Sequence, residues 1–226
     1  MNETIIAVGN GGYNLAKDLI SAGLFTEARL IVCDTDQTTL KDSANNSEFI
    51  HLEKFRGKVK SRDTELVEDI VGKATDTVII CVTLGGMTGS KYAPLIALDA
   101  ILKEILVCTL FSMPYEFEGK EKIKRAMDAK MQLIVSSNFA IQQNNDRLKA
   151  VDSLGLNDMN RPLVETVNAV LNDRPLKELA IEPNNNSLQK LIPEEYQVKD
   201  MPLVWIRSDT YRGISEVDRK NIFDLY

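Results

Sequence analysis

The stretch that decides the fold is Thr77-Val78-Ile79-Ile80-Cys81-Val82, followed after two residues by Gly85-Gly86-Met87-Thr88-Gly89-Ser90-Lys91. Every residue of the first segment is apolar or β-branched, which is typical of a central parallel strand that is covered on both faces. The second segment is a glycine-rich turn that leads into a helical pattern. This order of strand, glycine turn and helix indicates an α/β protein.

The same alternation extends along the chain to about residue 172. The expected strands are Thr4–Val8, Ala28–Cys33, Glu48–His51, Thr77–Val82, Glu104–Leu110 and Gln132–Val135. The expected helices are Tyr13–Ala22, Thr64–Lys73, Tyr92–Leu102, Lys120–Ala129, Ala140–Ala150 and Leu163–Leu171. The pattern predicts a doubly wound, mostly parallel, Rossmann-like sheet in residues 1–172. Residues 173–226, which prolines interrupt, are expected to form a short extension with one late strand at Leu203–Ile206.

Composition excludes several classes of function. The chain has 226 residues, 44% of them hydrophobic and 27% charged, which is typical of a globular domain with its own core. Its formal net charge of −6 argues against bulk electrostatic binding of nucleic acid. A single histidine argues against zinc sites and most histidine-based catalysis, so no metal ligands are assigned.

The cysteines and the apolar runs bear on the compartment. Cys33, Cys81 and Cys108 each end an apolar run, so buried free thiols on strands are expected, in keeping with a reducing cytoplasm. We expect no signal peptide at the N-terminus and no membrane span, because no apolar segment approaches about 20 residues.

A second glycine turn, Gly9-Asn10-Gly11-Gly12-Tyr13-Asn14, follows the first strand and opens a helix. Glycines let backbone N–H groups approach an anion, and a helix N-terminus adds partial positive charge. Two such turns at the carboxyl ends of neighbouring strands would face one crevice. The pair therefore indicates a phosphate-binding site, whereas either turn alone is also explained by tight backbone geometry.

Asp34, at the end of the second strand, leaves a dinucleotide-binding module open as an alternative. An acid at this place holds a ribose hydroxyl in NAD-binding folds. The first turn, however, reads G-x-G-G-x-N instead of G-x-G-x-x-G, which weakens the NAD hypothesis.

Five segments, in the same order and spacing, resemble the nucleotide-binding domain of the FtsZ/tubulin superfamily, and FtsZ more closely. Gly85–Lys91, followed by Ala93-Pro94, is similar to the family signature GGGTGTG followed by AAP. The first turn is similar to a shortened GxGGxGxN loop. The other three are Asp34-Thr35-Asp36, similar to NTD; Tyr115–Lys120, similar to FSFEGK; and Ser137-Asn138, in the place of a purine-reading Pro-Asn.

The resemblance implies a site for GTP or GDP, with Mg²⁺ accompanying GTP, in a protein of cell-division or cytoskeletal type. It implies these roles: Gly11, Gly12 and Asn14 on the diphosphate and base side; Gly85, Gly86, Thr88, Gly89 and Ser90 around the phosphates; Glu118 and Lys122 near the ribose; and Asn138 at the guanine. Asn14 and Asn138 could instead cap helices, and Glu118 could be a solvated first-turn acid.

Several positions depart from the family pattern. Met87 and Lys91 replace signature glycines, and Met87 would crowd the phosphates if its backbone needed a positive φ. The guanine-reading aspartate aligns best with Arg161, although Asp158 is nearby. The basic run 54–62 replaces a glycine-rich γ-phosphate loop, and it is either a solvated loop or a phosphate neutraliser.

Hydrolysis in the family uses acidic residues on a loop after the central helix. In the corresponding stretch, Ile181–Asn186, Glu182 is the only carboxylate, which makes it the candidate catalytic residue. The family's second domain is not expected in this sequence. Three hypotheses follow: a weak or inactive GTPase that acts through self-assembly, copolymerisation with a full-length FtsZ-like protein or partner binding; an active filament-forming GTPase; or an NAD-type module.

Overall fold

A seven-stranded sheet forms the centre of the molecule in a computed structural model that describes residues 3–36, 47–54, 61–148, 158–173 and 175–176, and the backbone of 203–207. The strands are β1 (Glu3–Val8), β2 (Arg29–Asp34), β3 (Ser47–His51), β4 (Thr77–Thr83), β5 (Leu106–Met113), β6 (Phe139–Asn144) and β7 (Leu203–Arg207). Their order is β3-β2-β1-β4-β5-β6-β7, with β1 to β6 parallel and β7 antiparallel. The prediction of a doubly wound, mostly parallel sheet is confirmed.

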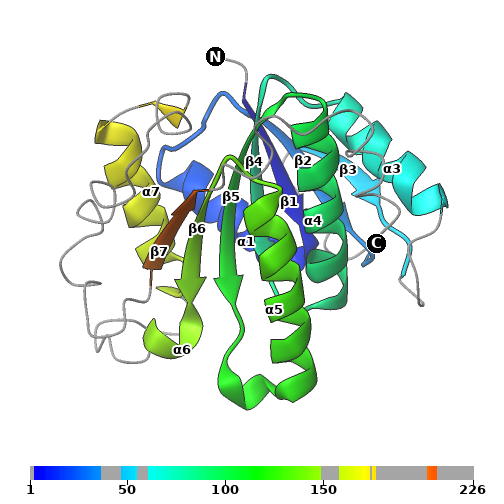
Figure 1. Ribbon diagram of the computed structural model, residues 1–226. Coiled ribbons are helices and arrows are strands. Elements are labelled where there is room, and N and C mark those ends of the chain that lie inside the picture. The colour runs from blue at the N-terminus through cyan, green and yellow to red at the C-terminus, as the bar shows by residue number, and fades with distance from the viewer. Residues whose placement is uncertain are drawn as a thin grey trace.

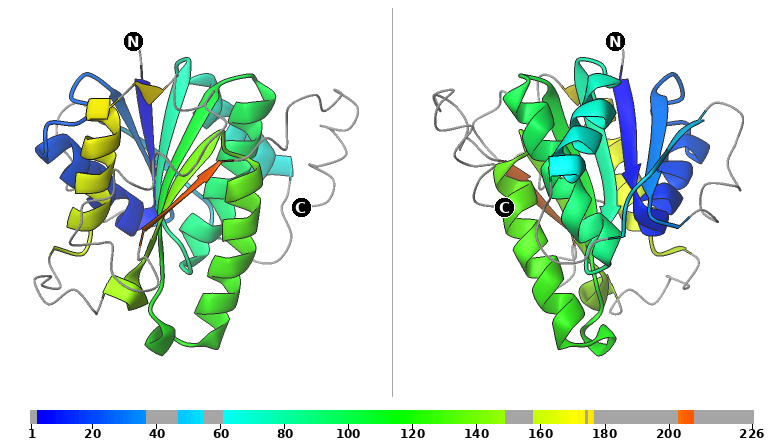
Figure 2. Two further views of the ribbon diagram at one scale, coloured as in Figure 1. Left: turned by 60° about the vertical axis from the view of Figure 1, so that its left-hand side comes forward. Right: turned by 90° about the vertical axis from the view of Figure 1, so that its right-hand side faces the viewer.

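Helices cover both faces of this sheet (Figures 1 and 2). One face carries α1 (Gly9–Ser21) and α7 (Arg161–Asp173), and Leu148 of the short helix α6 (Asn145–Leu148) joins the same core cluster. The other face carries α3 (Ser61–Gly72), α4 (Met87–Leu102) and α5 (Lys120–Val135). A short 3-10 helix, η1 (Glu116–Glu118), precedes α5. Among the described residues, no helix is long and apolar enough to cross a membrane.

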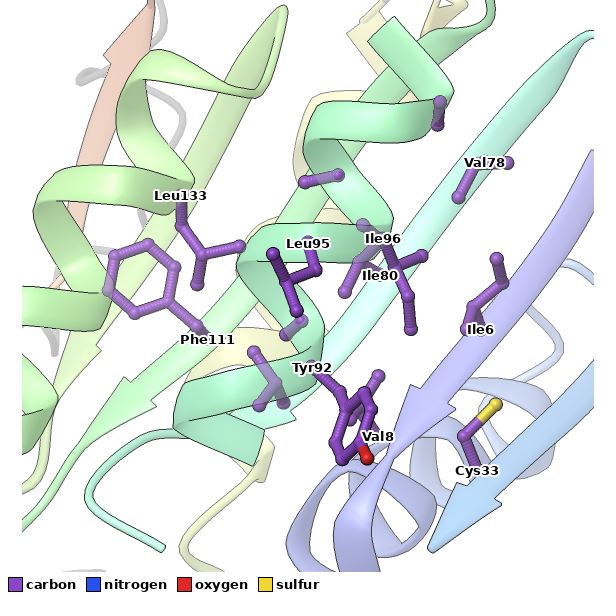
Figure 3. Close-up of a cluster of buried hydrophobic side chains, with 14 of the residues drawn as sticks. Ile6, Val8, Cys33, Val78, Ile80, Tyr92, Leu95, Ile96, Phe111 and Leu133 are labelled. Carbon is purple, nitrogen blue, oxygen red and sulfur yellow. The ribbon is translucent and has the colours of Figure 1, made fainter. Parts of the chain in front are cut away.

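Alternating side chains along each strand build two separate cores. In β1, Ile5 and Ala7 face α1, whereas Ile6 and Val8 face the opposite layer. Figure 3 shows this second core, in which Tyr92, Leu95 and Ile96 of α4 lie over the central strands. Burial on both faces explains why the central strands are uninterrupted apolar runs. The three cysteines, at positions 33, 81 and 108, are buried free thiols on strands, as expected.

The boundary between α5 and β6 differs from the sequence prediction. Residues 132–135 belong to α5, so the prediction of a strand there is wrong. The buried positions Ala126, Ala129 and Leu133 continue a helical spacing through this segment. The next strand is residues 139–144, where a helix was expected, because this segment pairs with β5 and extends the sheet. Pairing partners of this kind cannot be read from local composition.

The late strand predicted at Leu203–Ile206 is confirmed as β7. It pairs with β6 along the register from Phe139↔Arg207 to Gln143↔Leu203. A segment of the predicted C-terminal extension therefore belongs to the same sheet as the first domain. Its pairing satisfies backbone groups that an edge strand would otherwise expose.

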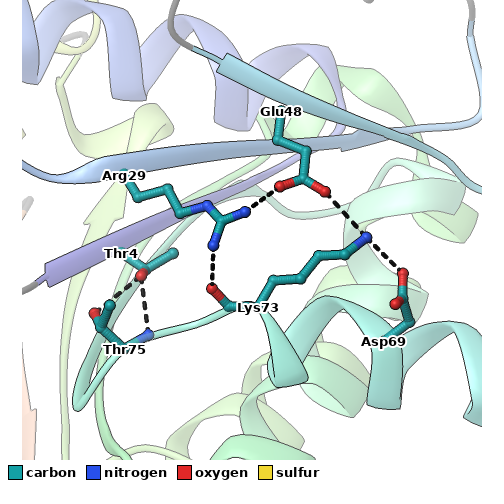
Figure 4. Close-up of polar contacts among 6 residues, drawn as sticks. All are labelled: Thr4, Arg29, Glu48, Asp69, Lys73 and Thr75. Atoms are coloured by element: carbon teal, nitrogen blue, oxygen red, sulfur yellow. Dashed lines mark hydrogen bonds and ion pairs between the residues drawn. The ribbon is translucent and has the colours of Figure 1, made fainter.

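Polar contacts join β2, β3 and the end of α3 at the amino edge of the sheet (Figure 4). Arg29 of β2 and Lys73, just after α3, both pair with Glu48 of β3. Arg29 also donates to the carbonyl oxygen of Lys73 at 2.8 Å, and Lys73 pairs with Asp69 at 2.7 Å. These four residues are hereafter called the amino-edge network.

Candidate functional site

The two glycine turns converge on one cavity at the carboxyl edge of the sheet, as the sequence predicts. β1, β2 and β4 end at Val8, Asp34 and Thr83, and all three residues line this cavity, whose volume is about 520 Å³. Its remaining walls come from the two turns, the segment after β2 and α5: Gly9, Asn10, Gly11, Asp36, Leu84, Gly86, Met87, Thr88, Gly89 and Lys122. We call it the carboxyl-edge cavity. Its size suits a nucleotide-sized ligand.

The first glycine turn brings α1 unusually close to β4. A Cβ atom at Gly12 would lie 2.2 Å from the carbonyl oxygen of Cys81, and one at Gly11 would lie 2.4 Å from Oγ1 of Thr83. Gly9 takes φ +75° where β1 turns into the helix. Gly11 lines the cavity, but buried Gly12 serves the packing of α1 on the sheet.

The second glycine turn directs a helix N-terminus at the cavity. α4 begins after Gly86, and its first backbone bond runs from the N–H of Ser90 to the carbonyl of Gly86. The preceding N–H groups of Met87, Thr88 and Gly89 therefore have no partner within the helix. Together with the helix dipole they form a site that favours an anion.

Met87 and Lys91, the departures from the signature, are both accommodated. Among the described residues, positive φ angles at non-glycine positions occur only at Phe25 and Glu104, and the residue of the turn that needs glycine is Gly85 at φ +94°. Met87 is instead an ordinary first residue of α4 with an exposed side chain. Its backbone therefore adds no strain to the turn.

Lys91 lies away from the carboxyl-edge cavity. Its Nζ forms a buried ion pair with Asp63 of α3 at 2.8 Å and lies 4.5 Å from the centre of the Tyr92 ring. The Tyr92 hydroxyl donates to the same carboxylate at 2.7 Å. Burial, with the bond to Asp63, raises the pKa of the Tyr92 hydroxyl. Lys91 thus joins α3 to α4, and the turn does not use its charge.

Among the residues that the structure describes, the charges that line the cavity are two acids and one paired base. Asp34 is buried, and its Oδ1 accepts from the N–H groups of Thr35 at 2.7 Å and Asp36 at 3.3 Å. Thr35 in turn contacts Thr88 through their hydroxyls at 3.0 Å, which joins the segment after β2 to the second turn. Lys122 forms an ion pair with Glu118, so part of its charge is already neutralised.

The remaining predicted residues lie outside the lining of this cavity. Asn14 is exposed on α1, and Ser90 is buried with its Oγ accepting from the N–H of Gly85 at 2.8 Å. Glu118 accepts from the N–H of Tyr115 at 2.8 Å and pairs with Lys122, which lines the cavity. Arg161, at the start of α7, lies 4.0 Å from Glu165, and Asp158 is exposed. Glu182, Asn184–Asn186 and residues 55–60 of the basic run are outside the described residues.

Asn138 lies at the opposite edge of the sheet. Its Oδ1 accepts from the N–H of Val107 at 2.7 Å, and its own N–H donates to the carbonyl of Val107 at 2.9 Å. It thus joins the amino ends of β5 and β6. This placement follows from the corrected position of β6, and it gives no support to a contact between Asn138 and a base.

Other residues occupy the carboxyl edge without having been singled out from the sequence. Asn144 and Asn145 stand where β6 ends, and Asn145 accepts from the amide of Gln143 at 3.0 Å. Arg125 of α5 donates through Nε to the carbonyl of Gly85 at 2.8 Å. The double asparagine is a visible signal, but nothing in the sequence links Arg125 to a turn forty residues earlier.

The fold and the cavity define a class of protein: a three-layer α/β domain with two glycine turns and a helix N-terminus at one edge of the sheet. Residues 3–153 match the family model "Tubulin/FtsZ family, GTPase domain". The chain belongs to the Tubulin/FtsZ family, as its sequence resemblance predicts.

Relatives and solved structures agree with this assignment. The chain is 34% identical over 170 residues to the cell division protein FtsZ of Mycoplasmopsis pulmonis, a match that covers 70% of this chain and 43% of that protein. The fold is similar to an empty FtsZ dimer from M. jannaschii, with a TM-score of 0.57, 22% identity and coverage of 75% of this chain and 53% of that one. It is also similar to a GDP-bound CetZ1 monomer from Haloferax volcanii, with a TM-score of 0.59, 16% identity and coverage of 85% and 64%. The chain thus spans less than half the length of the curated FtsZ relative.

Proposed function

We propose that this chain binds a guanine nucleotide, GTP or GDP, in the carboxyl-edge cavity. The observation that carries the proposal is the convergence of both glycine turns on that cavity, with the N-terminus of α4 aimed at it. The phosphates lie against the N–H groups of residues 86–89, where dipole and donors favour negative charge. Family membership and the GDP-bound CetZ1 neighbour support guanine as the base.

Mg²⁺ accompanies GTP in this proposal. The cavity presents the carboxylates of Asp34 and Asp36, and oxygen ligands of this kind suit Mg²⁺ shared with phosphates. Lys122, the cation among the described lining residues, is paired with Glu118. The residues therefore fit a cation that would offset repulsion between the triphosphate and the two acids.

Gly86 offers a test that spares the fold. It has φ −69° and ψ 155°, it lines the cavity, and a Cβ atom there would meet nothing within 4 Å. Gly86→Asp supplies a favourable helix cap but places a negative charge in the anion site. We expect it to weaken GDP affinity about tenfold or more in calorimetry.

Gly86→Ser is the matched control, because serine caps equally well without charge. Its GDP dissociation constant should stay within about threefold of the parent chain's, a change of less than about 1 kcal/mol in binding free energy. Equal GDP affinity of the Gly86→Asp variant and the parent chain would show that the phosphates do not bind at this turn. Binding of NAD in place of GDP would instead support the NAD-type alternative. That alternative stays open because Asp34, the acid that would hold a ribose hydroxyl, lines the cavity.

We further propose that GTP hydrolysis by this chain is weak or absent. Support comes from the sequence Ile181–Asn186, where asparagines stand in place of family acids and Glu182 is the remaining carboxylate. Phosphate release from GTP and Mg²⁺ should stay at or slightly above that of a protein-free control. Release that rises steeply with protein concentration and is abolished by Glu182→Ala would contradict this and establish an active GTPase.

Assembly or partner binding in a cell-division or cytoskeletal setting completes the proposal. The chain would self-associate weakly or copolymerise with a full-length FtsZ-like protein in the cytoplasm, a compartment that its buried free cysteines suit. Co-sedimentation with such a relative in GTP should bring this chain into the pellet. Long polymers of this chain alone at low micromolar concentration would contradict weak self-association.

A further inference from the structure

The peptide group between Gly85 and Gly86 is anchored by a side chain from another helix. Arg125 of α5 donates through Nε to the carbonyl of Gly85 at 2.8 Å, and its Nη1 donates to the sulfur of Met87. On the preceding side, the N–H of Gly85 donates to Ser90 at 2.8 Å. Side chains thus hold both polar groups of Gly85, the residue of the turn with a positive φ.

Geometry links this anchor to the phosphate site. In a trans peptide the carbonyl and the following N–H point in opposite directions. A carbonyl of Gly85 that points at Arg125 therefore turns the N–H of Gly86 away from α5. Gly86 lines the carboxyl-edge cavity, whereas Arg125 lines a separate cavity of about 410 Å³ between α4 and α5. Arg125 thus approaches the turn from the side opposite to the phosphates.

Close packing leaves the turn little room to adopt another shape. A Cβ atom at Gly85 would lie 2.7 Å from Cγ of Lys122 and 3.2 Å from a ring carbon of Pro114. Gly85 is therefore pressed against the start of α5, one helical turn from Arg125. A bond from a charged donor is stronger than a neutral one, so loss of the guanidinium would remove the strongest polar contact of the Gly85 carbonyl and leave packing alone to orient this peptide.

We propose that Arg125 is a positioning residue of the phosphate-binding turn, which holds the Gly85–Gly86 peptide so that the N–H of Gly86 stays available to phosphate. The bond from Arg125 to the Gly85 carbonyl carries this proposal. The role in ligand binding rests on the proposed function. Because the anchor itself is a property of the ligand-free protein, it can be tested separately.

Ligand affinity gives the first measurement. Arg125→Ala should weaken GDP binding about tenfold, the effect expected for one charge-assisted hydrogen bond. Arg125→Lys, which retains the charge and a donor, should recover part of this loss. Lys124→Ala is the matched control: Lys124 is the adjacent cation on α5, exposed, and without a hydrogen bond or ion pair among the described residues. It should leave the affinity within about twofold, because exposed charges are screened.

Amide hydrogen exchange without nucleotide gives the second measurement. The amides of Gly85 and Ser90 are both bonded within the turn, so Arg125→Ala should accelerate their exchange while the amides of β4 keep theirs. Unchanged exchange in the turn, or equal losses of GDP affinity in the Ala variants of Arg125 and Lys124, would overturn the inference. Failure of the parent chain to bind GDP would refute the proposed function. The exchange measurement would still show whether Arg125 holds the Gly85–Gly86 peptide in the ligand-free protein.

Discussion

Glycines occur in the two turns for different physical reasons. Gly86 faces open space in the carboxyl-edge cavity, whereas Gly12 is glycine because α1 touches the backbone of β4. Sequence alone presents both as members of one phosphate-binding pattern. The difference depends on which atoms a Cβ would meet, which only the packed structure supplies.

Gly12→Ala should lower the free energy of unfolding by about 2 kcal/mol, the cost of overpacking a close-packed interior. The reason is the 2.2 Å approach of the added Cβ atom to the carbonyl oxygen of Cys81. Urea denaturation measures the change. Gly72→Ala is the control, since it ends α3 with nothing within 4 Å, and it should be neutral or slightly stabilising. Equal stability of the Gly12 variant and the parent would show that α1 does not approach β4 in this way.

Lys91 shows how a residue-scale interpretation changes with its neighbours. A lysine beside a glycine turn suggests phosphate binding, but Lys91 instead forms an ion pair with the buried carboxylate of Asp63. Asp63 lies on a helix that starts thirty residues earlier, so spacing along the chain does not predict this ion pair. Asn138 is a similar case, because its position relative to β6 decides which edge of the sheet it occupies.

At the scale of elements, the pair of Lys91 and Asp63 fastens α3 to α4. Both side chains are 8% exposed, and the Tyr92 hydroxyl donates to the same carboxylate. Asp63→Asn removes this carboxylate charge from a buried ion pair, which should cost about 3 kcal/mol of stability. The change is measured by chemical denaturation. Glu65→Gln, at an exposed position of the same helix, should change stability by less than about 0.5 kcal/mol. Equal effects of the two substitutions would contradict a buried ion pair.

The amino-edge network predicts a pH dependence. Hydrogen bonds from Lys73 and Arg29 hold the pKa of Glu48 below its ordinary value of 4.5. A lowered folded-state pKa gives stability that is present above pH 4.5 and is lost as the pH falls through the folded-state pKa. Glu48→Gln should therefore be less stable than the parent near neutral pH, by at most about 1 kcal/mol for so exposed a pair.

Thermal melts of both proteins between pH 3 and pH 7 measure this difference, which should shrink as the pH falls below 4.5. High salt should also reduce it, because exposed charges are screened. A difference that persists unchanged at pH 3 would exclude the ionised carboxylate as its source.

Sequence predicts elements well where both faces of the sheet are covered. β1, β2, β4 and β5 read as apolar runs because the two cores bury both sides of each strand. The prediction at β6 was wrong because this segment carries Gln142 and Gln143, and it forms a strand through its pairing with β5 and β7. The extension of α5 through Val135 was missed for the converse reason, since its apolar end resembles a strand.

At the scale of the whole molecule, the strand order determines the site. The order β3-β2-β1-β4 places the ends of β1, β2 and β4 side by side, so turns that lie seventy residues apart meet at one edge. Periodicity does not reveal strand order, and the sequence predicts the convergence only through the rule that ligands bind at carboxyl ends of parallel strands. That rule identified the cavity and the glycine turns, but not Arg125, Asn145 or the paired state of Lys122.

The most direct test of the central claim is a crystal structure of the chain soaked with GDP. We predict diphosphate density in the carboxyl-edge cavity, within hydrogen-bond distance of the backbone N–H groups of residues 86–89, with Met87 turned outward and Arg125 still bound to Gly85. Density for the nucleotide at any other place, or a cavity filled by the protein's own side chains at saturating GDP, would contradict the account.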